Sequence, residues 1–162
     1  IQNIEYLTAK EPIKIISITT LSFDIFIFET LISLTRGLTL YMTNEDEQKV
    51  TEQLEKKIKE NQIQAIQTTP SVMKFHLDNI KDKENLKSLK YIMLAGEPLT
   101  KTLVNHIKEI IPGVTIYNGY GPSETTIFST TRDVTKLKEI TIGRPIANTQ
   151  IYILNKNKNI CL

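Results

Sequence analysis

The chain has 162 residues, 40% of them hydrophobic and 23% charged, which is typical of one soluble globular domain. The net charge is only +2, and lysines interleave with glutamates, as over residues 52–57, which argues against a nucleic-acid-binding protein. No apolar run is long enough to cross a bilayer, and the single cysteine, Cys161, fits a reducing, cytoplasmic location and excludes an internal disulfide.

Strand-like and helix-like segments alternate along the chain. The first predicted elements are a strand over residues 13–19, a helix over 24–35 that ends at Gly37, and a strand over 38–42. One continuous helix then begins at residue 43 or 44 and carries apolar residues at 50, 54 and 58, before a strand over 63–67. A helix capped by Thr69 runs to about residue 79, and a strand covers 89–94. A helix capped by Thr100 ends at 112–113, and strands at 114–117 and 150–154 complete the series.

This order predicts an α/β fold in which a mostly parallel sheet carries helices on both faces. Chemically distinctive residues follow several of the strands. They include Phe23-Asp24, Thr68-Thr69-Pro70, Ala95-Gly96-Glu97 and the segment 118–124. Because the carboxyl ends of parallel strands lie along one edge of a sheet, we expect these segments to converge on a single site.

The loop over residues 118–126 is the richest in chemistry. Its two glycines, Gly119 and Gly121, let the backbone approach a ligand closely. Tyr120 offers an aromatic face, Glu124 offers a hard oxygen ligand for magnesium, and Ser123 offers a donor to phosphate. These groups suggest a nucleotide site, although an ordinary Gly-Pro loop explains the spacing equally well.

Two other residue types have competing interpretations. Asp24 lies among aromatic and aliphatic residues, so it is either the N-cap of the following helix or a buried carboxylate that needs a cationic partner. The residues alone favour the cap. The two histidines, His76 and His106, lack neighbours at metal-ligand spacing, and we expect both on helix surfaces.

Four segments resemble the acyl-adenylate-forming enzymes, and within them the adenylation domains of nonribosomal peptide synthetases. Residues 118–124 resemble the signature N-x-Y-G-P-T/S-E, and residues 21–26 resemble S-F-D-x-S, with Phe26 in place of the usual small residue. Residues 94–99 resemble A-G-E-x-L, and residues 142–149 resemble I-G-x-P-I-x-N-T. The order and spacing of the four make the match specific, and it covers essentially the whole chain.

The resemblance implies ATP-dependent activation of an amino acid, with magnesium, followed by transfer to the phosphopantetheine of a peptidyl carrier protein. Asp24 would bind the substrate ammonium group. Ser123 and Glu124 would be catalytic, Ser123 at the α-phosphate and Glu124 as the magnesium ligand. The nucleotide would contact Gly96, Glu97, Asn118, Tyr120, Gly121 and Ser123.

By the same resemblance, the substrate side chain would enter a pocket that is uncharged and, apart from one hydroxyl, apolar or glycine. Its residues would be Ile25, Phe28, Thr68, Met93, Ala95, Gly119, Ile127 and Phe128. The two phenylalanines restrict its volume, so we expect an aliphatic amino acid of valine or isoleucine size.

The family's phosphate loop T-S-G-S/T-T-G-x-P-K, its T-G-D segment and its lid lysine are missing from residues 1–162. We therefore expect a single fragment of the large N-terminal subdomain of an adenylation domain, inactive by itself. Two alternatives stay open. One is a stand-alone ligase that charges D-alanine or another amino acid onto a carrier protein, and the other is a non-catalytic nucleotide- or amino-acid-binding module.

Overall fold

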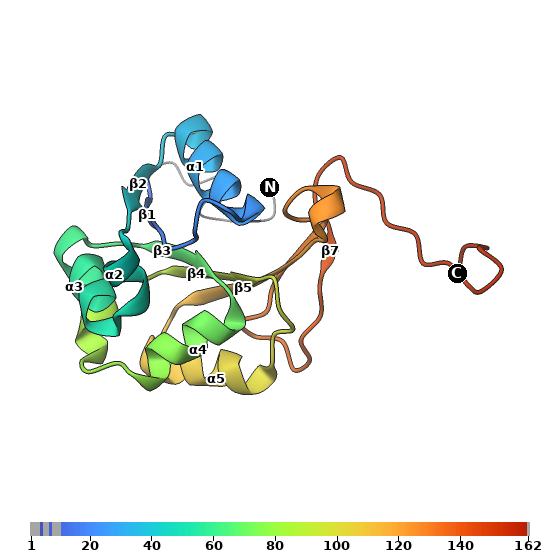
Figure 1. Ribbon diagram of the computed structural model, residues 1–162. Coiled ribbons are helices and arrows are strands. Elements are labelled where there is room, and N and C mark those ends of the chain that lie inside the picture. The colour runs from blue at the N-terminus through green and yellow to red at the C-terminus, as the bar shows by residue number, and fades with distance from the viewer. Residues whose placement is uncertain (1–3, 5–6, 8–10, 162) are drawn as a thin grey trace.

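The computed structural model describes residues 4, 7 and 11–161, which contain one seven-stranded sheet with flanking helices (Figure 1). The strands are β1 (Lys14–Ser17), β2 (Thr39–Met42), β3 (Ala65–Thr68), β4 (Tyr91–Ala95), β5 (Thr115–Tyr120), β6 (Thr130–Asp133) and β7 (Arg144–Pro145). The α-helices are α1 (Asp24–Arg36), α2 (Glu45–Lys49), α3 (Thr51–Asn61), α4 (Pro70–Asp78) and α5 (Lys101–Ile110). Short 3-10 helices include η2 (Lys83–Leu86) and η3 (Ser123–Thr125).

The strands are arranged in the order β2-β1-β3-β4-β5-β6-β7. Strands β1 to β5 pair in parallel, whereas β5 pairs with β6, and β6 with β7, antiparallel. The prediction of a mostly parallel sheet is confirmed. The two antiparallel strands were not predicted, because neither contains an apolar run.

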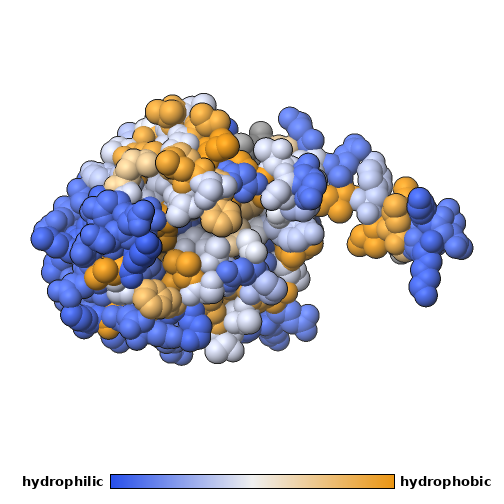
Figure 2. Space-filling model, viewed as in Figure 1, coloured by the Kyte–Doolittle hydropathy of each residue, from blue (hydrophilic) through white to orange (hydrophobic). Residues whose placement is uncertain are grey.

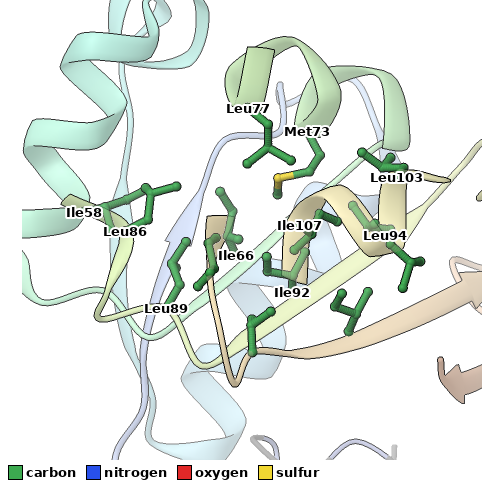
Figure 3. Packing of buried hydrophobic residues seen from close by; sticks show 14 of the residues in the cluster. Ile58, Ile66, Met73, Leu77, Leu86, Leu89, Ile92, Leu94, Leu103 and Ile107 are labelled. Carbon is green, nitrogen blue, oxygen red and sulfur yellow. The ribbon is translucent and has the colours of Figure 1, made fainter. Parts of the chain in front are cut away.

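Side chains alternate between two cores, one on each face of the sheet. Ile16, Ile66, Ile92 and Leu94 face the core that α3, α4 and α5 cover. Figure 3 shows the last three of these beneath the side chains of α4 and α5. Their sequence neighbours, such as Ile15, Ala65 and Met93, face the second core, which α1 covers with Phe28 and Ile32. Helices on both faces are therefore also confirmed.

Local sequence explains how several helices begin and end. Gly37 ends α1 in the left-handed conformation, at φ 66°, which glycine adopts without steric cost. The Thr69 hydroxyl accepts from the Val72 amide at the start of α4, and the Thr100 hydroxyl accepts from Leu103 at the start of α5. All three predicted boundaries are confirmed.

The single helix predicted from residue 43 or 44 onward is wrong, because the chain breaks at Val50 into α2 and α3. Val50 has an extended backbone, with φ −104° and ψ 108°, and its side chain is 43% exposed. Asn44 starts α2 through a capping box with Glu47. The Lys57 ammonium of α3 donates to the Glu47 carboxylate at 2.7 Å. This ion pair ties α2 to α3 across the break, so α2 does not continue the axis of α3.

Two further expectations are wrong. Residues 150–154 form no strand; they are exposed, and only Leu154 makes an isolated bridge, to Ile160. Among the described residues, β7 forms a ladder only with β6, and residues 150–154 do not pair with it. His76 is buried, not on the surface, because its helix face packs on α3, where its Nδ1 lies 3.0 Å from the Thr51 hydroxyl.

The outer face of α1 is apolar as well as its inner face. Ile27, Leu31 and Leu34 are 50%, 54% and 77% exposed, and Figure 2 shows apolar side chains gathered over this part of the surface. We call these three residues the α1 stripe.

In the described part of the chain, no helix has both the length and the apolar character that a membrane span requires.

Candidate functional site

Two adjoining depressions lie at the carboxyl ends of the parallel strands. The first, which we call the Asp24 depression, is lined by ten predicted site residues: Asp24, Ile25, Thr68, Ala95, Gly96, Glu97, Gly121, Ser123, Ile127 and Phe128. The second, the Tyr120 depression, is lined by Asn118, Gly119 and Tyr120 among others. Both share Gly96, Glu97, Gly121 and Pro122. The sheet edge therefore brings together most of the residues that the sequence singled out.

Asp24 is the first residue of α1 and not its N-cap, which is Phe23. No side-chain cap bond is present there; instead, one Asp24 carboxylate oxygen accepts from the Ile127 amide at 3.3 Å. Among the ion pairs of the described residues, none involves Asp24. The helix-cap interpretation is therefore wrong, and the carboxylate remains available to a cation at the rim of the depression.

The floor of the Asp24 depression continues into the second core. The rings of Phe28 and Phe128 meet edge to face, with centroids 5.0 Å apart and planes at 72°. Met93 is 0% exposed, so Phe28 and Met93 support the floor from below and do not line it. A Cβ on Gly119 would lie 2.8 Å from the Phe128 ring. Gly119 therefore makes room for the ring that closes the floor.

The segment that carries Ile127 folds back over β5 in a strained conformation. Thr126 and Ile127 have φ values of 62° and 67°, and left-handed backbone at a β-branched residue is unusual and costs about 1–3 kcal/mol. A Cβ on Gly121 would lie 2.4 Å from the Ile127 carbonyl oxygen. The sequence assigned the close approach at Gly121 to a ligand, whereas here the approaching group is the chain's own backbone.

The Tyr120 depression presents an aromatic face beside polar backbone. Tyr120 is 47% exposed at the end of β5. The side-chain amide of the buried Asn118 donates to the Thr141 backbone carbonyl at 2.9 Å. This bond holds the segment 140–142 in the wall of the Tyr120 depression. Of this segment, the sequence had singled out only Ile142, the first residue of the 142–149 motif, and had assigned it no place in the site. The Glu97 carboxylate is held by the Ser71 amide and hydroxyl, at 2.9 and 2.7 Å, at the start of α4.

Ser123 and Glu124 lie on η3, and both are exposed. Ser123 lines the Asp24 depression. Glu124 lines neither depression and has no hydrogen bond or ion pair within the described residues. No cluster of three or more potential metal ligands occurs in that part of the chain. A single free carboxylate suits magnesium, which commonly takes one or two protein carboxylates and completes its shell with phosphate and water.

Glu29 is a buried residue of this region that the sequence analysis missed. Its side chain, 0% exposed, lies beneath the β1–α1 connection and accepts from the hydroxyls of Ser17 and Thr19. Burial raises the pKa of the Glu29 carboxyl to about 7, while the two hydroxyls act in the opposite direction. Apolar residues occur on nearly all sides of α1, so the sequence pattern does not reveal that Glu29 lies on the buried face.

The comparisons with known proteins agree with this arrangement. The sequence profile of the AMP-binding enzyme family matches residues 2–161. The chain is 31% identical to tyrocidine synthase 3 of Brevibacillus parabrevis over 97% of its own length and 2% of that protein. It is 36% identical to gramicidin S synthase 1 of Brevibacillus brevis over 93% of its own length and 13% of that protein. It thus spans only a small part of these relatives.

Solved structures confirm the fold. The nonribosomal peptide synthetase FmoA3 superposes with a TM-score of 0.83 at 17% identity, over 94% of this chain and 17% of that one. The N-terminal subdomain of Klebsiella oxytoca NpsA gives a TM-score of 0.81 at 16% identity, over 99% of this chain and 40% of that one. The chain therefore belongs to the AMP-binding enzyme family and matches the adenylation domains of nonribosomal peptide synthetases over nearly its whole length.

Proposed function

We propose that the protein containing this chain activates an amino acid by ATP-dependent adenylation and transfers it to the phosphopantetheine thiol of a peptidyl carrier protein. The observation that carries the proposal is the Asp24 carboxylate, which has no cationic partner within the described residues and overlooks an apolar floor. A partly buried carboxylate above apolar surface suits an ammonium group whose side chain enters the depression. That is the charge pattern of an amino acid.

The nucleotide would occupy the adjoining Tyr120 depression. The half-exposed Tyr120 ring would stack on the adenine, and Asn118 and Gly96 would border the base. The walls that both depressions share would then bring the amino acid carboxylate close to the α-phosphate. Positioning of this kind supplies much of the acceleration when two substrates react. One solved relative in fold, FmoA3, is described in an AMPPNP-bound form and in an α-methyl-L-serine-AMP-bound form.

Ser123 and Glu124 would act at the phosphates. The Ser123 hydroxyl would donate to the α-phosphate. The Glu124 carboxylate would hold Mg²⁺, which neutralises phosphate charge when bound. Glu97 already accepts two hydrogen bonds from Ser71, so in this role it would fix the shared wall and the start of α4.

The substrate side chain would be aliphatic. Ala95, Ile127 and Phe128 give the depression an apolar lining, and Phe28 and Met93 below Phe128 leave little room for deepening. The hydroxyl-bearing residues Thr19, Thr20 and Thr68 also line the depression, so a small polar side chain is the nearest competitor. A carrier-protein partner is supported by PA1221, a fold relative that contains adenylation and PCP domains.

The test is amino-acid-dependent ATP–pyrophosphate exchange by the full-length protein with valine, isoleucine, phenylalanine, serine and glutamate. We expect the aliphatic amino acids to give the highest kcat/KM. Asp24→Asn should lower kcat/KM for the preferred amino acid about 10²–10⁴-fold, since removing one partner of a desolvated ion pair costs roughly 3–5 kcal/mol. Asp46→Asn, at an exposed carboxylate on α2, is the matched control. Full exchange by Asp24→Asn would refute the assignment.

A further inference from the structure

The hydrogen bonds of Glu29 join α1 to the end of β1. One carboxylate oxygen accepts from the Thr19 hydroxyl at 2.7 Å, and the other accepts from the Ser17 hydroxyl. No cation pairs with Glu29 in the described part of the chain. A fully buried carboxylate without a counter-charge is costly in free energy, so its presence calls for an explanation other than stability.

The partners of Glu29 belong to the Asp24 depression. Thr19 is itself one of its lining residues, and the connection that follows contributes Thr20 and Phe23. Asp24 begins α1 at the end of this connection. The Glu29 carboxylate therefore fixes the strand end on one side of the connection relative to the helix on the other side.

We propose that Glu29 is a positioning residue that sets the place of the Asp24 carboxylate in the amino acid pocket through its hydrogen bonds to Ser17 and Thr19. The inference rests on the proposed function, because it takes an amino acid as the ligand of that depression. It assigns Glu29 no contact with the substrate.

Apolar packing alone fixes α1 less precisely. Phe28 and Ile32 bury the same helix against the second core, but burial of apolar area is non-directional. Hydrogen bonds to fixed hydroxyls constrain both distance and angle. The position of α1 matters at Asp24, because its carboxylate lies 3.3 Å from the Ile127 amide, close to the upper limit for a hydrogen bond. A small slide of α1 along the sheet would break that contact.

The position of Glu29 also makes the pocket sensitive to pH. Burial raises the pKa of its carboxyl to about 7. On the elements packed against α1, Lys14 on β1 donates to the Asn61 carbonyl, and Tyr41 on β2 packs on the opposite core. Tyr91 on β4 and Tyr117 on β5 belong to the second core with α1, and both are neutral phenols that supply no counter-charge near pH 7. On α1 itself, Asp24 lies in the depression and Arg36 in the last turn. Ionisation would therefore place an uncompensated charge beneath the connection, and we expect the connection to loosen as the pH rises through about 7.

The experiment compares three variants of the full-length protein with the wild type. Glu29→Gln keeps the shape but cannot ionise, and Thr19→Val removes one hydroxyl. Thr30→Val is the matched control, because the Thr30 hydroxyl is bonded only to carbonyls of its own helix, those of Phe26 and Ile27. KM for the amino acid and KM for ATP are measured by pyrophosphate exchange from about pH 6 to about pH 8, across the range in which the group titrates.

In the wild type and in Thr30→Val, KM for the amino acid should rise at least about five-fold over that range, a typical coupling between sites. Glu29→Gln should abolish this pH dependence, and Thr19→Val should raise KM for the amino acid about five-fold throughout. KM for ATP should stay unchanged, because the Tyr120 depression does not include these residues. Equal rises in both KM values, or an unaltered pH dependence in Glu29→Gln, would overturn the proposal.

A second measurement does not depend on activity. Amide hydrogen exchange over residues 18–24 at about pH 8, where Glu29 is largely ionised, should be slower in Glu29→Gln than in Thr30→Val and faster in Thr19→Val than in Thr30→Val, while exchange in α5 stays the same. Equal rates over residues 18–24 in all three variants would refute the positioning role. Absence of amino-acid-dependent pyrophosphate exchange in the wild type would instead refute the proposed function, and the exchange of residues 18–24 would still decide the role of Glu29.

Discussion

The two glycines at the end of β5 should respond very differently to the same added methyl group. A Cβ on Gly121 would lie 2.4 Å from the Ile127 carbonyl oxygen and 2.8 Å from the Phe128 Cα, which are both backbone atoms. A Cβ on Gly119 would meet side-chain atoms, the Phe128 ring at 2.8 Å and the Met93 sulfur at 3.2 Å. Backbone that is already strained cannot retreat, whereas a methionine side chain can adopt another rotamer.

The magnitudes follow from these contacts. For Gly121→Ala, overpacking costs about 1–3 kcal/mol, and displacement of Ile127 also removes its bond to the Asp24 carboxylate, worth about 1.5–3 kcal/mol. The expected loss in the free energy of unfolding is therefore about 3–5 kcal/mol. For Gly119→Ala, a similar overpacking cost is offset by about 0.5–1 kcal/mol, since alanine is better than glycine in a strand interior. The net loss should stay below about 2 kcal/mol.

Urea denaturation followed by circular dichroism measures both changes, provided that the m-value stays the same in wild type and variants. The discriminating quantity is the difference between the variants, which should be at least about 1 kcal/mol, with Gly121→Ala the less stable. A Gly121→Ala protein as stable as Gly119→Ala would show that the segment around Ile127 does not hold the position described. The contact that gives Gly121 its role would then be wrong.

Three further predictions concern stability. Because the folded-state pKa of Glu29 is raised from 4.5 to about 7, its contribution to stability is fully present below about pH 4.5. It is lost as the pH rises to about 7, a decline of about 3 kcal/mol that Glu29→Gln should remove from a pH series of urea melts. Asn44→Ala removes the α2 capping box and should lower the free energy of unfolding by about 1 kcal/mol, and an unchanged denaturation midpoint would contradict this. Phe128→Ala should cost about 3–5 kcal/mol by the same assay, and a cost below about 1 kcal/mol would place the ring outside the core.

The parts of the fold that the sequence predicted depend on local signals. Buried strands are continuous apolar runs, and Gly37, Thr69 and Thr100 mark helix ends through their own backbone or hydroxyl chemistry. Parallel pairing followed from the alternation of strands and helices. The convergence of Asp24 and Tyr120 at one edge of the sheet followed in turn from parallel pairing.

The parts that the sequence did not predict depend on contacts between distant segments. The break at Val50 goes with the Lys57–Glu47 ion pair, which no local pattern reveals. Strand β6 has the sequence Thr-Thr-Arg-Asp and pairs only because β5 offers it an edge. Within the site, the bond from the Ile127 amide to Asp24 joins residues 103 positions apart. The strain at Ile127 is likewise a property of the folded loop and not of its composition.

The α1 stripe has a practical consequence for the biochemistry of this chain. A helix that is apolar on its outer as well as its inner face is typical of a helix enclosed on all sides. In dilute buffer, the exposed Ile27, Leu31 and Leu34 should make the chain adhere to itself and to surfaces. Denaturation midpoints that drift upward with protein concentration would reveal such self-association. Replacing Leu31 and Leu34 by glutamine should keep the chain monodisperse without touching either core, which would provide a well-behaved background for the denaturation measurements above.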